Sequence, residues 1–210
     1  MYLALRPVPD VGHIMADMTA QSFSVVPANE KSKALATLVS AFTDDPFERW
    51  MYPNLQDYLT HFPKFLAAFG GNAFDQKTVW ALGDFAAVAL WLPPDVGPDG
   101  DTIVSVLRET LLPEHEDAFT LLDQMDEVHP TYRHWYLPWF GVRAGSQGRG
   151  LGGQLLDHCL RVVDQDHVPA YLESPNPRNV SFYERHGFVV TGVAEVGACP
   201  PIVFMLREAQ

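Results

Sequence analysis

A glycine-rich segment, Gln147-Gly148-Arg149-Gly150-Leu151-Gly152-Gly153, follows an apolar run and opens an amphipathic stretch. Glycines permit left-handed turns and let the backbone approach a ligand closely. The first N–H groups of a helix have no partner within it and lie at the positive end of its dipole. The segment therefore predicts a strand, loop and helix that bind an anion, most simply a diphosphate, through several convergent N–H groups.

The rest of the chain alternates strand and helix patterns. Before residue 130, the expected elements are a strand at 23–26, a helix capped by Asn29, a helical region at 47–69 and a hairpin of strands at 77–82 and 85–92 joined through Gly83-Asp84. After it, they are a strand at 135–142, a helix at 150–164, a strand at 170–173, a helix at 177–186 and two final strands. Residues 101–126 resemble two short helices broken at Pro113. We expect an N-terminal extension of uncertain structure at 1–20 and one domain at 21–210.

Composition restricts the partners and the compartment. A formal net charge of −12 argues against nucleic acid or an anionic membrane surface. Cys159 and Cys199 are too few for a disulfide framework, and none of the eight histidines has zinc-site spacing, so no metal is expected. Cys159 lies within the apolar stripe of the helix at 150–164, which favours a buried core thiol. Without a secretory signal or a membrane-length apolar run, we expect a cytoplasmic protein.

Two other phosphate-binding motifs overlap the glycine segment. Residues 145–150 have Walker-type glycine spacing, but Leu151-Gly152 follow where that loop needs Lys and Ser or Thr. From Gly148 to Gly153 the chain also fits G-x-G-x-x-G, with Glu173 at the distance of a ribose-binding acid in NAD proteins. However, five residues separate the expected strand from Gly148, and only 37 residues follow Glu173, too few for a doubly wound sheet. A NAD-binding Rossmann-type protein is therefore the less favoured alternative.

A third motif accounts for more of the chain. Gln-x-x-Gly-x-Gly from Gln147 to Gly152, after a strand ending in Gly141-Val142, resembles the acetyl-CoA loop of the GNAT N-acetyltransferases. Ala170–Glu173 resembles the next strand of that family, and Asn176–Phe188 resembles its Asn-to-Tyr helix ending in Gly-Phe. The chain departs from the family at Ala144, where a proline is common.

Within the family, the chain is most similar to the puromycin N-acetyltransferase branch. Three segments carry this likeness: Asp44-Asp45-Pro46-Phe47-Glu48-Arg49-Trp50, Ala87-Val88-Ala89-Leu90-Trp91-Leu92-Pro93-Pro94, and Leu172-Glu173-Ser174 leading into Pro177-Arg178-Asn179. The resemblance implies an α/β (α+β) GNAT fold, with a mixed, mostly antiparallel sheet of about seven strands flanked by helices. It also implies a splayed central strand pair, in which a bulged strand can accommodate Pro138.

The resemblance implies an acetyl-CoA site. The backbone of Phe140, Gly141 and Val142 would bind the pantetheine arm, and the Asn179 amide would meet the same arm. Asn179 and Tyr183 are four residues apart and share a helix face, which brings the Tyr183 hydroxyl near the sulfur. The diphosphate would bind the following residues: Gln147, Gly148, Arg149, Gly150, Leu151, Gly152 and Gly153.

The implied reaction is direct transfer of an acetyl group from coenzyme A to the amine of a small molecule, such as an aminonucleoside or an antibiotic-like acceptor. Tyr183 would protonate the leaving thiolate, if its pKa is lowered, or donate a hydrogen bond to it. The ammonium must lose a proton first, for which Glu173 is the tentative base, with Glu48, Asp44, Asp45 or a water relay as alternatives. Phe47 and Trp50 are candidate acceptor-binding residues. A non-catalytic acyl-CoA-binding module remains the other possible function.

Overall fold

A mixed sheet forms the centre of the protein. The computed structural model describes residues 22–210, so the expected extension at 1–20 lies outside the described residues. Seven strands pair in the order β1-β2-β3-β4-β5-β7-β6, and every neighbouring pair is antiparallel except β4 and β5, which are parallel. The strands are β1 (Phe23–Val25), β2 (Val79–Leu82), β3 (Ala87–Leu92), β4 (Trp135–Val142), β5 (Ala170–Ser174), β6 (Val189–Ala194) and β7 (Ile202–Arg207). This arrangement confirms the expected GNAT fold.

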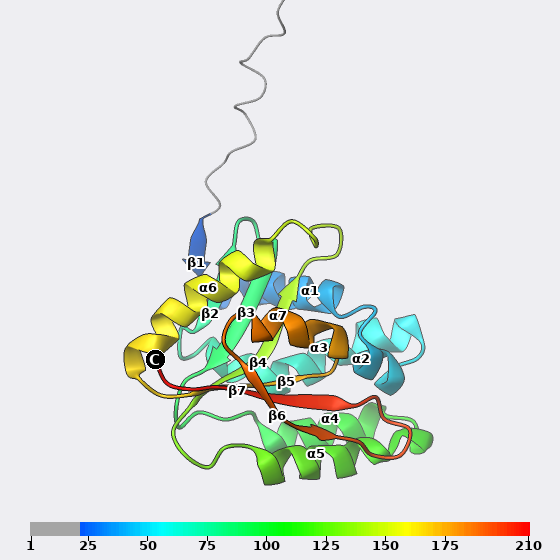
Figure 1. Cartoon of the computed structure of the whole chain (residues 1–210). Coiled ribbons are helices and arrows are strands. Elements are labelled where there is room, and N and C mark those ends of the chain that lie inside the picture. Colours follow the sequence, from blue (N-terminus) through cyan, green and yellow to red (C-terminus); the bar gives the residue numbers. More distant parts are fainter. Residues whose placement is uncertain (1–21) are drawn as a thin grey trace, which may run out of the picture.

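Helices cover both faces of the sheet (Figure 1). They are α1 (Lys31–Ala41), α2 (Pro46–Met51), α3 (Leu55–Gly70), α4 (Gly100–Thr110), α5 (Asp117–Val128), α6 (Leu151–Val163) and α7 (Val180–Glu184). The expected helical region at 47–69 is two helices, because the Asn54 side chain accepts hydrogen bonds from two backbone N–H groups and starts α3. The predicted cap at Asn29 is wrong, since a 3₁₀ turn at Ala28–Glu30 precedes α1 and no side chain caps either element.

The central strand β3 is buried on both faces. Val88, Leu90 and Leu92 pack in the core with α1 to α5, whereas Ala87, Ala89 and Trp91 pack in the core with α6 and α7. A strand that is covered on both sides has no polar face, which explains the continuous apolar run in the sequence.

The strand β4 carries a bulge. Leu90 pairs with Trp139 and Leu92 with Tyr136, so two residues of β4, Leu137 and Pro138, oppose one residue of β3. The extra residue changes which side chains face α1 to α5, and Trp139 joins Tyr136 on that face. Proline has no N–H to donate to a ladder, and the bulge therefore accommodates Pro138 inside a central strand.

The parallel pair β4 and β5 separates early. Its register includes only Trp135 with Ala170 and Tyr136 with Tyr171, although both strands continue beyond these residues. From Leu137 to Val142 the edge of β4 that faces β5 thus has no strand partner among the described residues. This is the expected splayed pair, and it opens a gap in the middle of the sheet.

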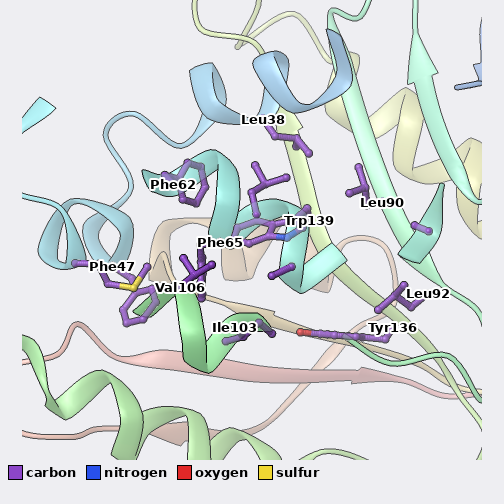
Figure 2. Close-up of a cluster of buried hydrophobic side chains, with 14 of the residues drawn as sticks. Leu38, Phe47, Phe62, Phe65, Leu90, Leu92, Ile103, Val106, Tyr136 and Trp139 are labelled. Atoms are coloured by element: carbon purple, nitrogen blue, oxygen red, sulfur yellow. The ribbon is translucent and has the colours of Figure 1, made fainter. Parts of the chain in front are cut away.

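The indole of Trp139 organises the core between β4 and α3. Rings from α3 and from the end of α1 meet it edge-on at centroid distances of 5.2 to 6.1 Å: Phe42, Phe62, Phe65 and Phe69. Figure 2 shows Phe62 and Phe65 beside Trp139, with Leu38 and Leu90 around them. A Cβ added at Gly70 would lie 2.5 Å from Cδ1 of Trp139, so the end of α3 touches the indole directly. This packing holds β4 in place close to the point where it separates from β5.

Candidate functional site

The glycine loop leads from β4 into α6 as expected. Gly145, Gly148 and Gly150 all have positive φ, between 74° and 79°, which side-chain-bearing residues rarely adopt. Gly150 is the N-cap of α6 and no side chain caps the helix. The first N–H groups of α6 are therefore free of capping bonds and available to an anion.

Three predicted loop residues have structural contacts. Gln147 donates a hydrogen bond from Nε2 to the carbonyl of Val142 at 3.1 Å, which holds the loop against the end of β4. Leu151, the first residue of α6, is buried in the core between that helix and the sheet. A Cβ added at Gly152 would lie 3.3 Å from Cγ2 of Val142, so α6 packs closely on β4. By contrast, Gly148 and Arg149 are exposed.

The residues predicted to meet the pantetheine arm lie on the unpaired edge of β4. Phe140 packs its ring against Phe182 at 5.7 Å and against Tyr183 at 6.4 Å. Gly141 has a different packing role, because an added Cβ would lie 2.6 Å from Cβ of Ala41. Its missing side chain thus admits α1, while its backbone remains on the strand edge.

Tyr183 is nine-tenths buried at the gap between β4 and β5, and Asn179 is exposed one helical turn earlier. The Asn176 side chain caps this segment by accepting a hydrogen bond from the N–H of Arg178. Burial raises the pKa of Tyr183, and the nearby Asp45 carboxylate raises it further. The raised pKa keeps the hydroxyl protonated, which favours the second of its two expected roles, donation of a hydrogen bond.

Two carboxyl groups at the start of α2, those of Asp45 and Glu48, are buried close to one another. Asp45 caps the helix, accepting from the N–H of Phe47 at 3.1 Å, and burial raises its pKa to about 6. Glu48 is only 1 % exposed, and its Oε2 has no hydrogen-bond partner among the described residues. Burial, followed by the charge of Asp45, raises the pKa of Glu48 well above its ordinary value. Asp44, the third acidic candidate, is exposed.

A cavity that is partly open to solvent lies where β4 and β5 separate. Its walls are apolar and aromatic, and Glu48 and Glu173 are the acidic groups that line it. Of the two candidate acceptor-binding residues, Phe47 lines the cavity, whereas Trp50 packs outside it against Phe47 and His115. The other lining residues are Phe65, Phe69, Leu122, Met125, Tyr136, Pro138, Trp139, Pro175 and Ile202.

Glu173 belongs to a hydrogen-bonded network. Its side chain is 6 % exposed, and its Oε2 accepts a short hydrogen bond from the Tyr136 hydroxyl. Oε1 lies 3.5 Å from Nδ1 of His129, and Nε2 of His129 lies 3.0 Å from Nε2 of His134. The network runs from the cavity toward the surface, because both histidines are partly exposed.

Sequence reasoning missed the other members of this network. His129, His134 and Tyr136 come from the end of α5, the following connection and β4, whereas Glu173 is on β5. No short motif joins them, because the contact depends on β4 and β5 pairing in parallel at Tyr136 and Tyr171. The one sequence signal for the histidines is that both lie within six residues before a buried strand.

Residues 22–210 contain no group of three or more His, Cys, Asp or Glu side chains arranged to hold a metal ion. In the same range, no helix has both the length and the apolar character needed to cross a membrane.

Solved structures share this fold across nearly the whole chain. A structure described as histone acetyltransferase HPA2 and related acetyltransferase, from Corynebacterium glutamicum, matches with a TM-score of 0.61 and 22% identity over 90% of this chain and 97% of that one. An agmatine N-acetyltransferase matches with a TM-score of 0.63 and 13% identity over 88% of this chain and 97% of that one. A polyamine N-acetyltransferase of Drosophila melanogaster matches at 0.64 and 12%, covering 89% and 99%. At these identities the likeness shows the fold alone.

Sequence comparison extends the likeness to the family. An uncharacterized N-acetyltransferase of Schizosaccharomyces pombe is 30% identical, over 88% of this chain and 82% of its own length. The model of the acetyltransferase (GNAT) family matches residues 35–188, which include most of α1, the splayed strands, the glycine loop and the helix of Tyr183. The splayed sheet, the glycine loop at the start of α6 and these matches agree, and the chain belongs to the GNAT family of N-acetyltransferases.

Proposed function

We propose that this protein transfers an acetyl group directly from acetyl-CoA to the amine of a small molecule. One observation carries the proposal: a glycine loop with uncapped N–H groups and a cavity containing carboxylates lie at the same splay of β4 and β5. The unpaired edge of β4 connects them. An elongated donor and a compact acceptor could thus meet at the middle of the sheet.

The glycine loop and the β4 edge fit acetyl-CoA. The uncapped N–H groups at Gly152 and Gly153, together with the loop glycines, suit the diphosphate, and the backbone of Phe140 to Val142 suits the amides of the pantetheine arm. Asn179 is exposed four residues before Tyr183 and would meet this arm. When bound, acetyl-CoA supplies an activated acetyl group and a thiolate leaving group.

In the proposed reaction, Tyr183 donates a hydrogen bond to the departing sulfur. Its hydroxyl stays protonated because burial and Asp45 both raise its pKa. Full proton transfer from such a phenol to a thiolate would be uphill, since an ordinary thiol has a pKa near ~8.5. A hydrogen bond from Tyr183 stabilises the thiolate without requiring that transfer.

Glu173 acts as the base that removes a proton from the bound ammonium. It lines the cavity, and Tyr136 holds one of its oxygens. Glu48 has a supporting role, because its unpartnered oxygen borders the same cavity and an ammonium group would favour its ionised form. Aromatic walls such as Phe47 and Phe69 would contact the apolar body of the acceptor.

The acceptor is therefore a small primary amine with an apolar body. The likeness to the puromycin-modifying branch adds an aminonucleoside or a similar antibiotic to the candidates. The agmatine and polyamine acetyltransferases with this fold act on small amines, which agrees with the acidic groups of the cavity.

Two experiments test the proposal in sequence. Calorimetric titration with acetyl-CoA and with NAD tests the donor, and tighter binding of NAD would overturn the assignment. Release of free thiol from acetyl-CoA is then measured with a panel of phenethylamine, hexylamine, cadaverine and puromycin. We expect thiol release that depends on at least one amine, whereas tight acetyl-CoA binding without any turnover would indicate a non-catalytic acyl-CoA-binding module.

A further inference from the structure

Two histidine rings lie between the acceptor cavity and the solvent. His129 is the residue after α5, and His134 directly precedes β4. Nδ1 of His129 lies 3.5 Å from Oε1 of Glu173, and the Nε2 atoms of the two histidines are 3.0 Å apart. The Nδ1 of His134 is 2.7 Å from the carbonyl of Tyr132. Three titratable side chains thus form one continuous line from the cavity to the surface.

The carbonyl of Tyr132 determines where the protons are. A carbonyl only accepts, so Nδ1 of His134 must carry the proton of that hydrogen bond. Burial is the largest cause lowering the pKa of His134, so its ring is neutral and its Nε2 is an acceptor. Nε2 of His129 must then donate to it. In neutral His129 this leaves Nδ1 bare and facing the carboxylate of Glu173.

In this tautomer of His129, no proton lies between its Nδ1 and Oε1 of Glu173. Two bare acceptors face each other across 3.5 Å, and a proton placed on either atom converts the contact into a hydrogen bond. Oε2 of Glu173 already accepts from the Tyr136 hydroxyl. The network has a built-in position for one additional proton next to the cavity.

Aromatic rings hold His129 in place. It meets Tyr136 edge-on at 4.8 Å and Tyr171 at 4.9 Å, while its ring is 4.9 Å from that of His134. The titratable side chains that face the histidines are Glu173 and Tyr171 on β5, Tyr136 on β4, and Tyr132 in the connection. Burial raises the pKa of Tyr136 and that of Tyr171, so both phenols stay neutral.

We propose that His129 and His134 relay the proton of the acceptor amine from Glu173 to solvent. The proposal rests on the proposed acetyltransferase function. The ammonium N–H bond breaks, its electron pair stays on nitrogen, and Glu173 binds the proton. Glu173 then passes a proton to Nδ1 of His129, while the Nε2 proton of His129 passes to Nε2 of His134. His134 releases one proton to water, and exchange with solvent at the partly exposed rings restores the starting tautomers.

The proton positions can be tested without any acceptor. Long-range proton–nitrogen NMR spectra of the full chain, with His129→Gln and His134→Gln used for assignment, report which ring nitrogens carry protons. The relay predicts a proton on Nδ1 of neutral His134 and on Nε2 of His129. A neutral His134 protonated on Nε2, or a His129 protonated on Nδ1 alone, would overturn it.

Kinetics test the transfer itself. With the panel amine that the wild-type protein acetylates fastest, His129→Gln and His134→Gln should each lower kcat about tenfold or more and leave the KM for acetyl-CoA nearly unchanged. Added imidazole should restore part of the activity of His134→Gln, because a small base can replace a partly exposed ring. His158→Gln is the matched control, since that ring stacks on Phe23 away from the cavity and should keep normal turnover.

The two hypotheses fail in different ways. If no panel amine is acetylated by the wild-type protein, the proposed function is contradicted, whereas the NMR result still decides the proton positions. If the wild-type protein is active and both histidine variants keep its kcat, the relay alone is wrong. A fall in kcat with no response to imidazole, in variants that unfold at a lower temperature than wild type, would indicate a structural role and also overturn the relay.

Discussion

At the scale of single residues, burial sets the chemistry of the gap between β4 and β5. Asp45, Glu48 and Tyr183 lie close enough for their charges to interact, and burial is the largest cause of the raised pKa of each. With a pKa of about 6, Asp45 is ionised at neutral pH and favours the protonated form of Tyr183. A carboxylate thereby keeps the phenol in the state that can donate a hydrogen bond.

Tyr183→Phe removes that donor and little else. The ring remains to pack against Phe140 and Phe188, so acetyl-CoA affinity should be nearly unchanged. A hydrogen bond to a developing thiolate contributes about 1.5–3 kcal/mol, so kcat should fall roughly 10- to 100-fold. Steady-state kinetics with calorimetry separate the two effects. Unchanged turnover would exclude Tyr183 from catalysis.

Asp45→Asn should alter how stability depends on pH. A carboxyl whose pKa rises from 3.8 to about 6 on folding binds protons more strongly in the native state, so its contribution to stability falls as the pH rises from about 4 to 6. Asn still accepts at the N-cap and is never charged. The variant should be more stable than wild type at pH 7, by up to about 3 kcal/mol, and the difference should vanish below pH 4.

Urea unfolding of both proteins between pH 3.5 and 7 measures this difference. Glu48 has a pKa shift of the same sign, and because burial is its largest cause, only the smaller part due to the Asp45 charge differs between the two proteins. A gain that is equally large at every pH would show that Asp45 is not buried as an ionised group at neutral pH.

The sequence predicted the burial of some single residues but not the contacts of others. Cys159 was predicted from its position in an apolar helical stripe, and the structure confirms it as a fully buried thiol. Glu173 was a candidate from its place at a strand end. Its histidine partners were not, because they meet it only after two distant segments pair as parallel strands. Local periodicity predicts burial well but contains no information on such a contact.

At the scale of elements, close packing of helices on β4 shapes the site. Gly141 lets α1 approach the strand, and Gly152 does the same for α6. The two helices thereby hold the strand from both sides while its edge toward β5 stays free.

Gly141→Ala should destabilise the fold. The added Cβ would lie 2.6 Å from Cβ of Ala41 and 3.1 Å from Cδ2 of Leu38, so backbone of α1 or β4 must move. Overpacking of this kind costs typically ~1–3 kcal/mol. Gly97→Ala is the control, because nothing lies within 4 Å of its added Cβ. Thermal and urea unfolding compare them, and equal stability of the two variants would contradict close packing of α1 on β4.

Gly150→Ala should weaken acetyl-CoA binding without changing the chemistry. At φ = 76° an added side chain is strained by ~1–2 kcal/mol, which the loop can relieve only by turning its N–H groups. We expect the KM for acetyl-CoA to rise roughly five- to thirtyfold and kcat to stay close to wild type. Gly97→Ala again serves as the control in steady-state kinetics. A fall in kcat with an unchanged KM would place Gly150 outside the diphosphate site.

Most elements were predictable because each has a local signal. Helical spacing of apolar residues and the glycine at the start of α6 located the helices, and the hairpin at Gly83-Asp84 located β2 and β3. The cap at Asn29 failed because a proline two residues earlier starts a 3₁₀ turn instead. Pro138 fitted a central strand only through a bulge, which depends on pairing with β3 and was expected from the family resemblance.

At the scale of the whole molecule, the site is a consequence of topology. The cavity takes its walls from α2, α3, α5, β4, β5 and β7, which come from almost the full length of the described chain. The glycine loop is contiguous in sequence and could therefore be recognised directly. The cavity is built from segments that are distant in sequence. The sequence alone therefore could not show that Phe47 lines it and Trp50 does not, although both lie on one short helix.

The most direct test of acetyl transfer is a single-turnover reaction with isotopically labelled acetyl-CoA and the amine panel, followed by mass spectrometry of the amine and assay of free thiol. The proposed function predicts one labelled N-acetyl amine for each thiol released, and a slower yield with Tyr183→Phe and with Glu173→Gln. Thiol release without an acetylated amine, or no reaction with any amine despite bound acetyl-CoA, would contradict it.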